Sequence, residues 1–251
     1  MDILIVGYGR MGHEVERALS ERGHNVCGMV DPFVPEASDK LTPDLLEKSD
    51  AVIEFSLPEG VPDNVSLYAA AGVPAVLGTT GWDAERPKVK KIIEDNNGSL
   101  IWGYNFSVGA HMFFHLGGIA AEMLNRIPGY DIWIHEIHHN KKKDSPSGTA
   151  LTAARRILEK YSGKTKLVPE KLDRQIEKNE LHVSSSRGGH VPGTHTVFLD
   201  SVNDTIEITH RARNRSGFAL GSVLAAEWLS GKKGFFQVED FISDLITGGN
   251  S

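Results

Sequence analysis

Short runs of hydrophobic residues alternate with amphipathic segments along the first hundred residues of the chain. Runs without regular polar alternation are typical of strands buried on both faces, as in a parallel sheet. The segments between them carry apolar residues at helical spacing, and in the first of them Val15, Ala18 and Leu19 share one face. The expected strands are Ile3–Val6, Val26–Val30, Ala51–Phe55, Pro74–Leu77 and Leu100–Trp102, and the expected helices are Met11–Arg22, Pro43–Lys48, Pro62–Ala71 and Ala84–Asn96.

This alternation predicts right-handed βαβ crossovers and therefore a doubly wound parallel sheet. Gly23 and Gly72 stand where two of the helices should end, and Asp83 stands where its carboxylate can cap the start of another. We therefore expect an α/β fold in this part of the chain, with ligands bound at the carboxyl ends of the strands.

The pattern changes after residue 105. One strand and one helix are followed by a polar stretch, and then by two strands of alternating polarity that a Ser-Val-Asn-Asp turn joins into a hairpin. Such a region is expected to form a mixed or antiparallel sheet with few helices. The expected elements are the strand Asp131–His139, the helix Ser147–Tyr161, the hairpin strands His195–Leu199 and Thr205–Thr209, a helix that begins at Ser216 and a short helix around Val238–Ile246.

Charge and cysteine content exclude several classes of protein. The 251 residues include 27 basic and 33 acidic ones, so the formal net charge is −6 and no positive surplus is present to neutralise a nucleic-acid backbone. Cys27 is the single cysteine, which excludes an intramolecular disulfide and is typical of a reduced, cytoplasmic protein. The longest charge-free apolar stretch, 106–121, is too short and too polar to cross a bilayer. We expect a cytoplasmic protein with neither a nucleic-acid nor a membrane partner.

A glycine motif of the form G-x-G-x-x-G follows the first expected strand and precedes the first expected helix. The first glycine allows a tight turn, the second lets the backbone approach a pyrophosphate, and the third lets the helix pack closely on the strand. The motif alone occurs by chance in many chains, but here it has the strand and the helix of a dinucleotide site around it. The candidate cofactor-binding residues of this loop are Gly7, Tyr8, Gly9, Arg10, Met11 and Gly12.

Asp31 ends the second expected strand, 24 residues after Gly7. A carboxylate at this place accepts hydrogen bonds from the adenosine ribose and repels a 2′-phosphate, and no basic residue follows before Lys40. We expect NADH to be at least as good a cofactor as NADPH. The alternative is an ordinary strand-end aspartate.

Two further turns close the fourth and fifth expected strands. In a doubly wound sheet these ends face the ligand crevice, so hydroxyls and free backbone groups there can line the nicotinamide. The alternative is a pair of simple loop turns. The candidate residues are Gly78, Thr79 and Thr80 in the first turn, and Gly103, Tyr104, Asn105 and Phe106 in the second.

The segment 136–150 carries the densest set of reactive side chains in the chain. Ser147 is a natural N-cap, so the amides of Gly148 and Thr149 should point out of a helix N-terminus. Free amides and the positive end of a helix dipole can bind a carboxylate. We therefore expect Ser147, Gly148 and Thr149 to take part in substrate binding.

Two imidazoles and three ammonium groups precede this helix: His138, His139 and Lys141–Lys143. Together they form a compact cationic stretch that suits a small anionic substrate and contains candidate proton donors. One alternative is a solvated lysine run beside a capped helix. Another is a metal bound by the two histidines, but no third ligand stands at close spacing, so we expect no metal.

These motifs resemble the 4-hydroxy-tetrahydrodipicolinate reductase family, also called dihydrodipicolinate reductases. The family signature E-x-H-x-x-x-K-x-D-x-P-S-G-T-A matches at every fixed position, and the resemblance extends along nearly the whole chain. Trp133 stands where the family usually has an acidic residue. The matching signature residues are Glu136, His138, Lys142, Asp144, Pro146, Ser147, Gly148, Thr149 and Ala150, and further matching segments include Asn105–Gly109, Arg187–Gly189 and Ile208–His210.

The resemblance implies a fold and a domain organisation. Residues 1–105 would form a dinucleotide-binding (Rossmann) domain that the C-terminal helices of residues 216–251 complete. Residues 106–215 would form a central α+β domain, whose mixed sheet binds the substrate and assembles a homotetramer.

The resemblance also implies a reaction, the reduction of a cyclic dicarboxylate by NADH or NADPH with loss of water, in lysine biosynthesis through diaminopimelate. His138 and Lys142 would be the proton donors, His139 would contact the substrate, and the amides of Gly148 and Thr149 would hold a carboxylate.

Two other functions are consistent with parts of the sequence. Another dehydrogenase would share the glycine loop and Asp31, but it has no need of the stretch from His138 to Thr149. A non-enzymatic NADH sensor that binds DNA or a partner would need a basic face or a recognition helix, which the net charge of −6 does not favour.

Overall fold

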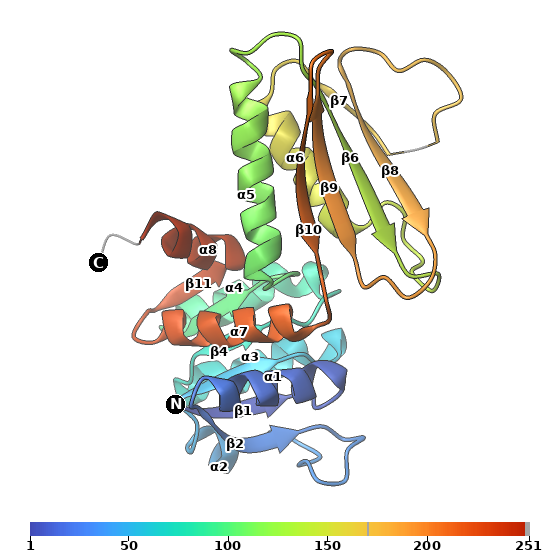
Figure 1. Ribbon diagram of the computed structural model, residues 1–251. Helices are drawn as coiled ribbons and strands as arrows, with labels where there is room; N and C mark the ends of the chain where they lie inside the picture. Colours follow the sequence, from blue (N-terminus) through green and yellow to red (C-terminus); the bar gives the residue numbers. More distant parts are fainter. Residues whose placement is uncertain (170, 249–251) are drawn as a thin grey trace. The chain divides into compact units, whose positions relative to one another are not determined.

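A computed structural model of the protein describes residues 1–169 and 171–248. Contacts divide the chain into two compact units, shown in Figure 1. The first contains residues Met1–Val108 and the C-terminal segment from Arg215, and the second contains Gly109–Asn214.

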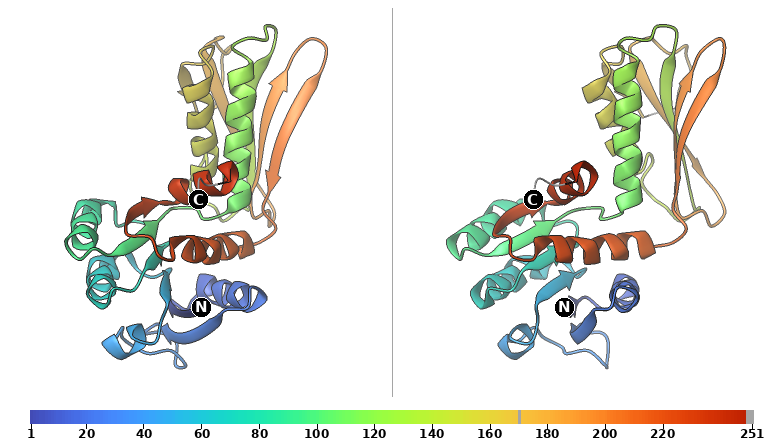
Figure 2. Two further views of the ribbon diagram at one scale, coloured as in Figure 1. Left: turned by 90° about the vertical axis from the view of Figure 1, so that its left-hand side faces the viewer. Right: turned by 60° about the vertical axis from the view of Figure 1, so that its left-hand side comes forward.

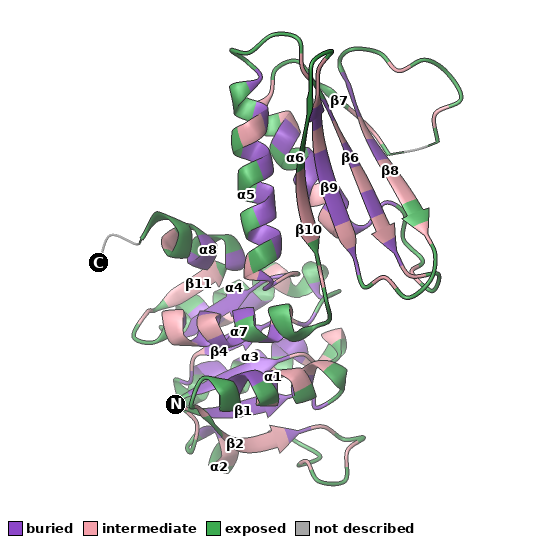
Figure 3. Ribbon diagram, viewed as in Figure 1, coloured by how far each residue is buried: buried purple, intermediate pink, exposed green. Residues whose placement is uncertain are grey.

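The first unit is built on a six-stranded sheet in the order β11-β5-β4-β3-β1-β2. Every neighbouring pair is parallel, as continuous apolar runs predict. The central strands are buried along nearly their whole length, as Figure 3 shows in purple. The strands are β1 (Asp2–Val6), β2 (Asn25–Val30), β3 (Ala51–Glu54), β4 (Ala75–Leu77), β5 (Ser99–Trp102) and β11 (Gly234–Gln237).

Helices cover both faces of this sheet, because successive strand side chains point to opposite faces. Helices α1, α7 and α8 pack with Ile3 and Ile5 on one face, and α2, α3 and α4 pack with Leu4 and Val6 on the other. The doubly wound α/β fold is therefore confirmed. The helices are α1 (Arg10–Glu21), α2 (Pro43–Leu46), α3 (Val61–Ala71), α4 (Arg86–Asp95), α7 (Ser216–Leu229) and α8 (Val238–Thr247), with short 3₁₀ turns at Pro58–Gly60 and Asp83–Glu85.

Two details of this unit differ from the sequence interpretation. The C-terminal segment adds a strand as well as helices: β11 pairs in parallel with β5 at the edge of the sheet, with Phe235 and Phe236 in the paired positions. Asp83 does not cap α4: the helix has no side-chain cap, and the Asp83 carboxylate pairs with Arg86.

The second unit contains a five-stranded mixed sheet in the order β10-β9-β6-β8-β7. Strand β9 is antiparallel to both β6 and β10, whereas β8 is parallel to β6 and β7. The predicted mixed sheet and its hairpin are confirmed. The elements are α5 (Val108–Met123), β6 (Asp131–His138), α6 (Gly148–Lys160), β7 (Lys166–Val168), β8 (Glu180–Arg187), β9 (Thr194–Asp200) and β10 (Thr205–Arg211).

Helices α5 and α6 both lie on one face of this sheet, as the two views of Figure 2 show. Phe113 and Phe114 of α5 and Ala153 of α6 pack there against Ile134 and other inward residues. On the opposite face, the rings of Trp133 and Phe198 stack with centroids 5.1 Å apart. Long helix α5 was not predicted, since its run of apolar residues and glycines shows no amphipathic period.

Candidate active site

The glycine loop after β1 has the geometry that phosphate binding requires. Gly7 has φ +88°, and a Cβ added there would lie 2.2 Å from the carbonyl oxygen of Phe55. A Cβ on Gly12 would lie 2.5 Å from the Gly7 oxygen, whereas one on Gly9 would meet no atom within 4 Å. Gly7 and Gly12 are thus required by the fold, while the space beside Gly9 is open to a ligand at the start of α1.

Asp31, the residue after β2, is hydrogen-bonded to the glycine loop at Tyr8. The Asp31 carboxylate accepts hydrogen bonds from the backbone amides of Tyr8 (2.8 Å) and Phe33 (2.9 Å). Each carboxylate oxygen keeps a further lone pair that a ribose hydroxyl can use. The Tyr8 side chain is buried and its hydroxyl donates to Glu16, which with burial raises the pKa of Tyr8 to about 12. Of the other loop residues, Arg10 is exposed and Met11 is half-buried.

The turns after β4 and β5 are tightly packed. A Cβ on Gly78 would lie 2.0 Å from the ring of Phe55, and one on Gly103 would lie 2.6 Å from Val238. The buried Thr79 hydroxyl accepts from the Ser56 amide at 2.8 Å, whereas Thr80 is exposed.

Residues 104–106 have three different surroundings. Tyr104 is exposed and bonds Asp83 and Arg86, the Asn105 side chain accepts from the amide of Ser107, and Phe106 belongs to the core. That these turns contact a cofactor stays a prediction.

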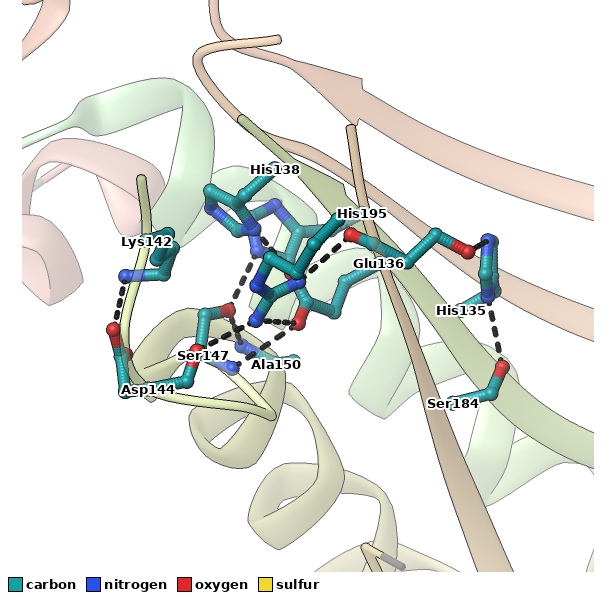
Figure 4. Close-up of polar contacts among 11 residues, drawn as sticks. His135, Glu136, His138, Lys142, Asp144, Ser147, Ala150, Ser184 and His195 are labelled. Carbon is teal, nitrogen blue, oxygen red and sulfur yellow. Dashed lines mark hydrogen bonds and ion pairs between the residues drawn. The ribbon is translucent and has the colours of Figure 1, made fainter. Parts of the chain in front are cut away.

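The reactive segment of the second unit begins at the end of β6 and ends at the N-terminus of α6, as Figure 4 shows. His138 is the last residue of β6 and is 7% exposed. Lys142 forms an ion pair with Asp144 at 2.8 Å and is half-buried, whereas Lys141 and Lys143 are exposed. Of the three adjacent lysines, Lys142 is therefore the one held at the site.

His139 follows on the same segment. Its backbone amide donates to the Val191 carbonyl at 2.8 Å, and its ring Nδ1 accepts from the Lys141 amide at 3.2 Å. The ring is half-buried, so it remains available to a ligand.

Ser147 caps α6 as predicted. Its hydroxyl oxygen accepts from the Ala150 amide at 3.2 Å and lies 3.0 Å from His195 Nε2. The Ser147 hydroxyl and the His195 ring thus share a hydrogen bond whose direction follows the tautomer of the ring. Burial lowers the pKa of His195 to about 4, which fits a neutral ring. Gly148 is exposed and Thr149 half-buried at the start of the helix.

Glu136 lies beneath these groups and has no solvent exposure. Its carboxylate bonds His138 Nδ1 and accepts from Arg187 at 2.7 Å. Burial raises the pKa of Glu136, but the Arg187 hydrogen bond and the His138 charge outweigh it and bring the pKa below its usual range. Burial lowers the pKa of His138, and Glu136 only partly offsets this.

A metal is not favoured at this cluster. One potential ligand atom from each of Glu136, His138 and His195 lies within 4.8 Å of the others. Strand β9 thus supplies a potential ligand, His195, that the spacing of the sequence motif did not indicate. However, the Arg187 guanidinium already neutralises the carboxylate, and the positive charge of Lys142 acts on both histidines. The cluster is best described as an ion-paired hydrogen-bond network.

Arg187 and His195 were not identified as site residues from the sequence. Register decides their position: Arg187 of β8 pairs with His138, and His195 of β9 pairs with Glu136. The matching Arg-Gly-Gly segment was the available signal for Arg187, whereas nothing local marked His195.

Comparisons with known proteins agree over nearly the whole chain. A family model described as "Dihydrodipicolinate reductase, N-terminus" matches residues 1–106, and one described as "Dihydrodipicolinate reductase, C-terminus" matches residues 109–242. A protein of Christiangramia forsetii named 4-hydroxy-tetrahydrodipicolinate reductase is 40% identical over 98% of this chain and 99% of its own length. A protein of the same name from Natronomonas pharaonis is 34% identical over 96% and 100%.

Among solved structures, a dipicolinate-bound dihydrodipicolinate reductase from Paenisporosarcina sp. TG-14 matches with a TM-score of 0.75. The match covers 94% of this chain and 97% of the other at 22% identity, so it shows a shared fold. Among the described residues, no helix is both long and apolar enough to cross a membrane.

Proposed function

The chain belongs to the dihydrodipicolinate reductase family, and we propose that the segment from His138 to Thr149 supplies the proton donors and the carboxylate site for its reaction. That reaction is the NAD(P)H-dependent reduction of 4-hydroxy-tetrahydrodipicolinate to tetrahydrodipicolinate with loss of water, in lysine biosynthesis through diaminopimelate. The enzyme is an oxidoreductase of amino-acid biosynthesis.

The glycine loop of the first unit suits the nicotinamide cofactor. Open space beside Gly9 and the first amides of α1 would hold the pyrophosphate, and Asp31 would accept from the adenosine ribose. Bound NADH or NADPH supplies the hydride. Because the Asp31 carboxylate repels a 2′-phosphate, we expect NADH to be used at least as well as NADPH.

The N-terminus of α6 suits one carboxylate of the substrate. Ser147 uses its hydroxyl to cap Ala150, so the amides of Gly148 and Thr149 stay free to donate to an anion. The half-buried ring of His139 would add a contact from the same segment.

Lys142 and His138 suit proton transfer. Hydride addition to a conjugated imine places negative charge on the substrate, and a cationic acid nearby lowers the barrier. Asp144 holds the Lys142 ammonium in place, and Glu136 holds the His138 ring by Nδ1. The convergence of an ion-paired lysine, a carboxylate-bound histidine and a capped helix N-terminus within one segment carries this proposal.

The test is an assay of NADH oxidation with substrate made in the cuvette from aspartate semialdehyde, pyruvate and the aldolase that precedes this step. Oxidation should require all three components. Oxidation with pyruvate or aspartate semialdehyde alone would instead indicate a different dehydrogenase, and NADH binding without any oxidation would indicate a sensor.

The sheet face of the second unit that points away from α5 and α6 would be the interface through which four chains assemble into a homotetramer. The stacked rings of Trp133 and Phe198 are half-buried there, and a second copy of the same sheet would cover them. Light scattering at micromolar concentration should give four chains, and a monomer would contradict this. A single cysteine and a biosynthetic reaction favour the cytoplasm as the compartment.

A further inference from the structure

We propose that Glu136 is a positioning residue: it fixes the orientation and tautomer of His138 and ties this histidine to the carboxylate-binding end of α6. The inference rests on the proposed roles of His138 and of the α6 N-terminus, and it adds a residue that acts through both.

One carboxylate joins three parts of the site. Glu136 Oε2 bonds His138 Nδ1, and Oε1 accepts from Arg187 at 2.7 Å and from the Ser147 backbone amide at 3.3 Å. Glu136 and His138 are two residues apart on β6, so their side chains share the inward face of the sheet. Because Arg187 is paired with the same carboxylate, the acceptor cannot rotate away from the histidine without breaking an ion pair.

The contact determines which nitrogen of His138 can act. A carboxylate at Nδ1 keeps the proton there and leaves Nε2 as the nitrogen that gains or donates a proton. Nε2 lies beside Gly193, where an added Cβ would be 2.9 Å away, so no side chain of that residue covers it. Loss of the Glu136 charge would leave the ring free to rotate and to change tautomer.

Glu136 also sets the charge of His138. The groups that face this ring are Glu136 on its own strand, Arg187 on β8, His195 on β9 and Lys142 in the following loop. Asp144 pairs with Lys142, and His210 of β10 lies behind His195. Glu136 is the negative charge in direct contact with the ring, so without it the protonated form of His138 is confined to lower pH.

The sheet offers a matched control in Glu180. This carboxylate is 2% exposed, lies at the other end of β8 and is paired with Arg174 and Lys166. Glu180 thus resembles Glu136 in its burial and in being paired with basic side chains, but the hydrogen bonds of its carboxylate go to Lys166, Arg174 and the Glu177 amide. A purely structural role predicts the same phenotype for both substitutions, whereas a positioning role predicts different ones.

The experiment compares Glu136→Gln, Glu136→Asp, Glu180→Gln and His138→Gln by kcat, KM, NADH affinity and the pH profile of kcat. Glu136→Gln should lower kcat roughly 10²-fold with unchanged NADH affinity, and should move the alkaline limb of the profile by about one unit to lower pH. Glu136→Asp keeps the negative charge but shortens the side chain by one methylene group. The alkaline limb of its pH profile should therefore stay near that of the parent protein, while its kcat should lie between those of the parent and Glu136→Gln. Glu180→Gln should reduce stability and leave the limb in place.

Glu136→Gln should lower kcat by a smaller factor in the His138→Gln background than in the parent protein, since the two residues act as a unit. An unmoved limb in Glu136→Gln, or additive losses in the double variant, would overturn the role of Glu136. If Glu136→Gln does not fold, Glu136→Asp decides, because parental kcat in that variant contradicts positioning. Full activity in His138→Gln would instead overturn the proposed function of the histidine.

Discussion

The two candidate sites of this protein are built in opposite ways. In the glycine loop of the first unit, Gly7 and Gly12 fit because they lack side chains, and the cofactor pyrophosphate would contact backbone amides. In the segment of the second unit, ionisable side chains are held by one another: Glu136 with Arg187 and His138, and Lys142 with Asp144. Damage to the first site should therefore act on binding and damage to the second on the reaction.

Loss of the Lys142 ammonium should have the largest effect. We expect Lys142→Gln and His138→Gln to lower kcat roughly 10²- to 10⁴-fold, the usual contribution of a positioned acid. NADH affinity, measured by fluorescence without substrate, should stay within about threefold, because neither side chain belongs to the glycine loop.

Exposed Lys143 is the control for this experiment. Lys143→Gln should cost less than about tenfold, and that cost should shrink as salt screens the local field. A larger loss for Lys143 than for Lys142 would show that the match of the signature to this segment is off by one residue.

The buried His195 should make the stability of the second unit depend on pH. Its pKa is about 4 in the folded protein against an ordinary value of 6.5, so the unfolded chain binds the proton first as the pH falls. The resulting stability is complete above pH 6.5 and is lost progressively toward pH 4, by roughly 2 kcal/mol between pH 7.5 and pH 5.

Urea titrations at the two pH values measure this loss. His195→Gln should flatten the pH dependence. Equal slopes in the parent protein and in His195→Gln would contradict the assignment of a neutral His195.

A methyl group added to the glycine loop should separate folding from binding. Gly7→Ala forces a side chain into a left-handed conformation and against the Phe55 carbonyl, so it should lower the free energy of unfolding by about 1–3 kcal/mol or more. Gly9→Ala meets no protein atom, so stability should persist while NADH affinity falls. Parental NADH affinity in Gly9→Ala would show that no phosphate approaches at this point.

The smallest expected effect concerns the choice of cofactor. Asp31→Ala removes an acceptor that serves only an unphosphorylated ribose, so kcat/KM should fall severalfold more for NADH than for NADPH. Steady-state kinetics with both cofactors measure the ratio. A parental preference for NADPH of tenfold or more would refute the expectation that NADH is at least as good.

Local sequence determined five of the six strands of the first sheet and the capped N-terminus of α6. Buried runs such as Ala51–Glu54, the glycine loop and the Ser147 cap each depend on neighbours within a few residues, so their patterns are visible along the chain. Strand β8 and helix α5 were missed for a physical reason. Strand β8 ends in three serines and an arginine, and α5 is apolar on most of its surface, so neither shows the period of its element.

Tertiary structure decided how the reactive groups are held. Strand pairing brings Arg187 opposite His138 across about 50 residues of sequence, and brings His195 opposite Glu136 across about 60. Strand pairing in this way gives the Glu136 carboxylate its counter-ion Arg187 and gives the Ser147 hydroxyl its ring partner His195. Sequence could identify the candidate proton donors and the capped helix terminus, because these features reside in single residues and their neighbours. It could not identify the network around them, because hydrogen-bond partners in a sheet are set by register between distant strands.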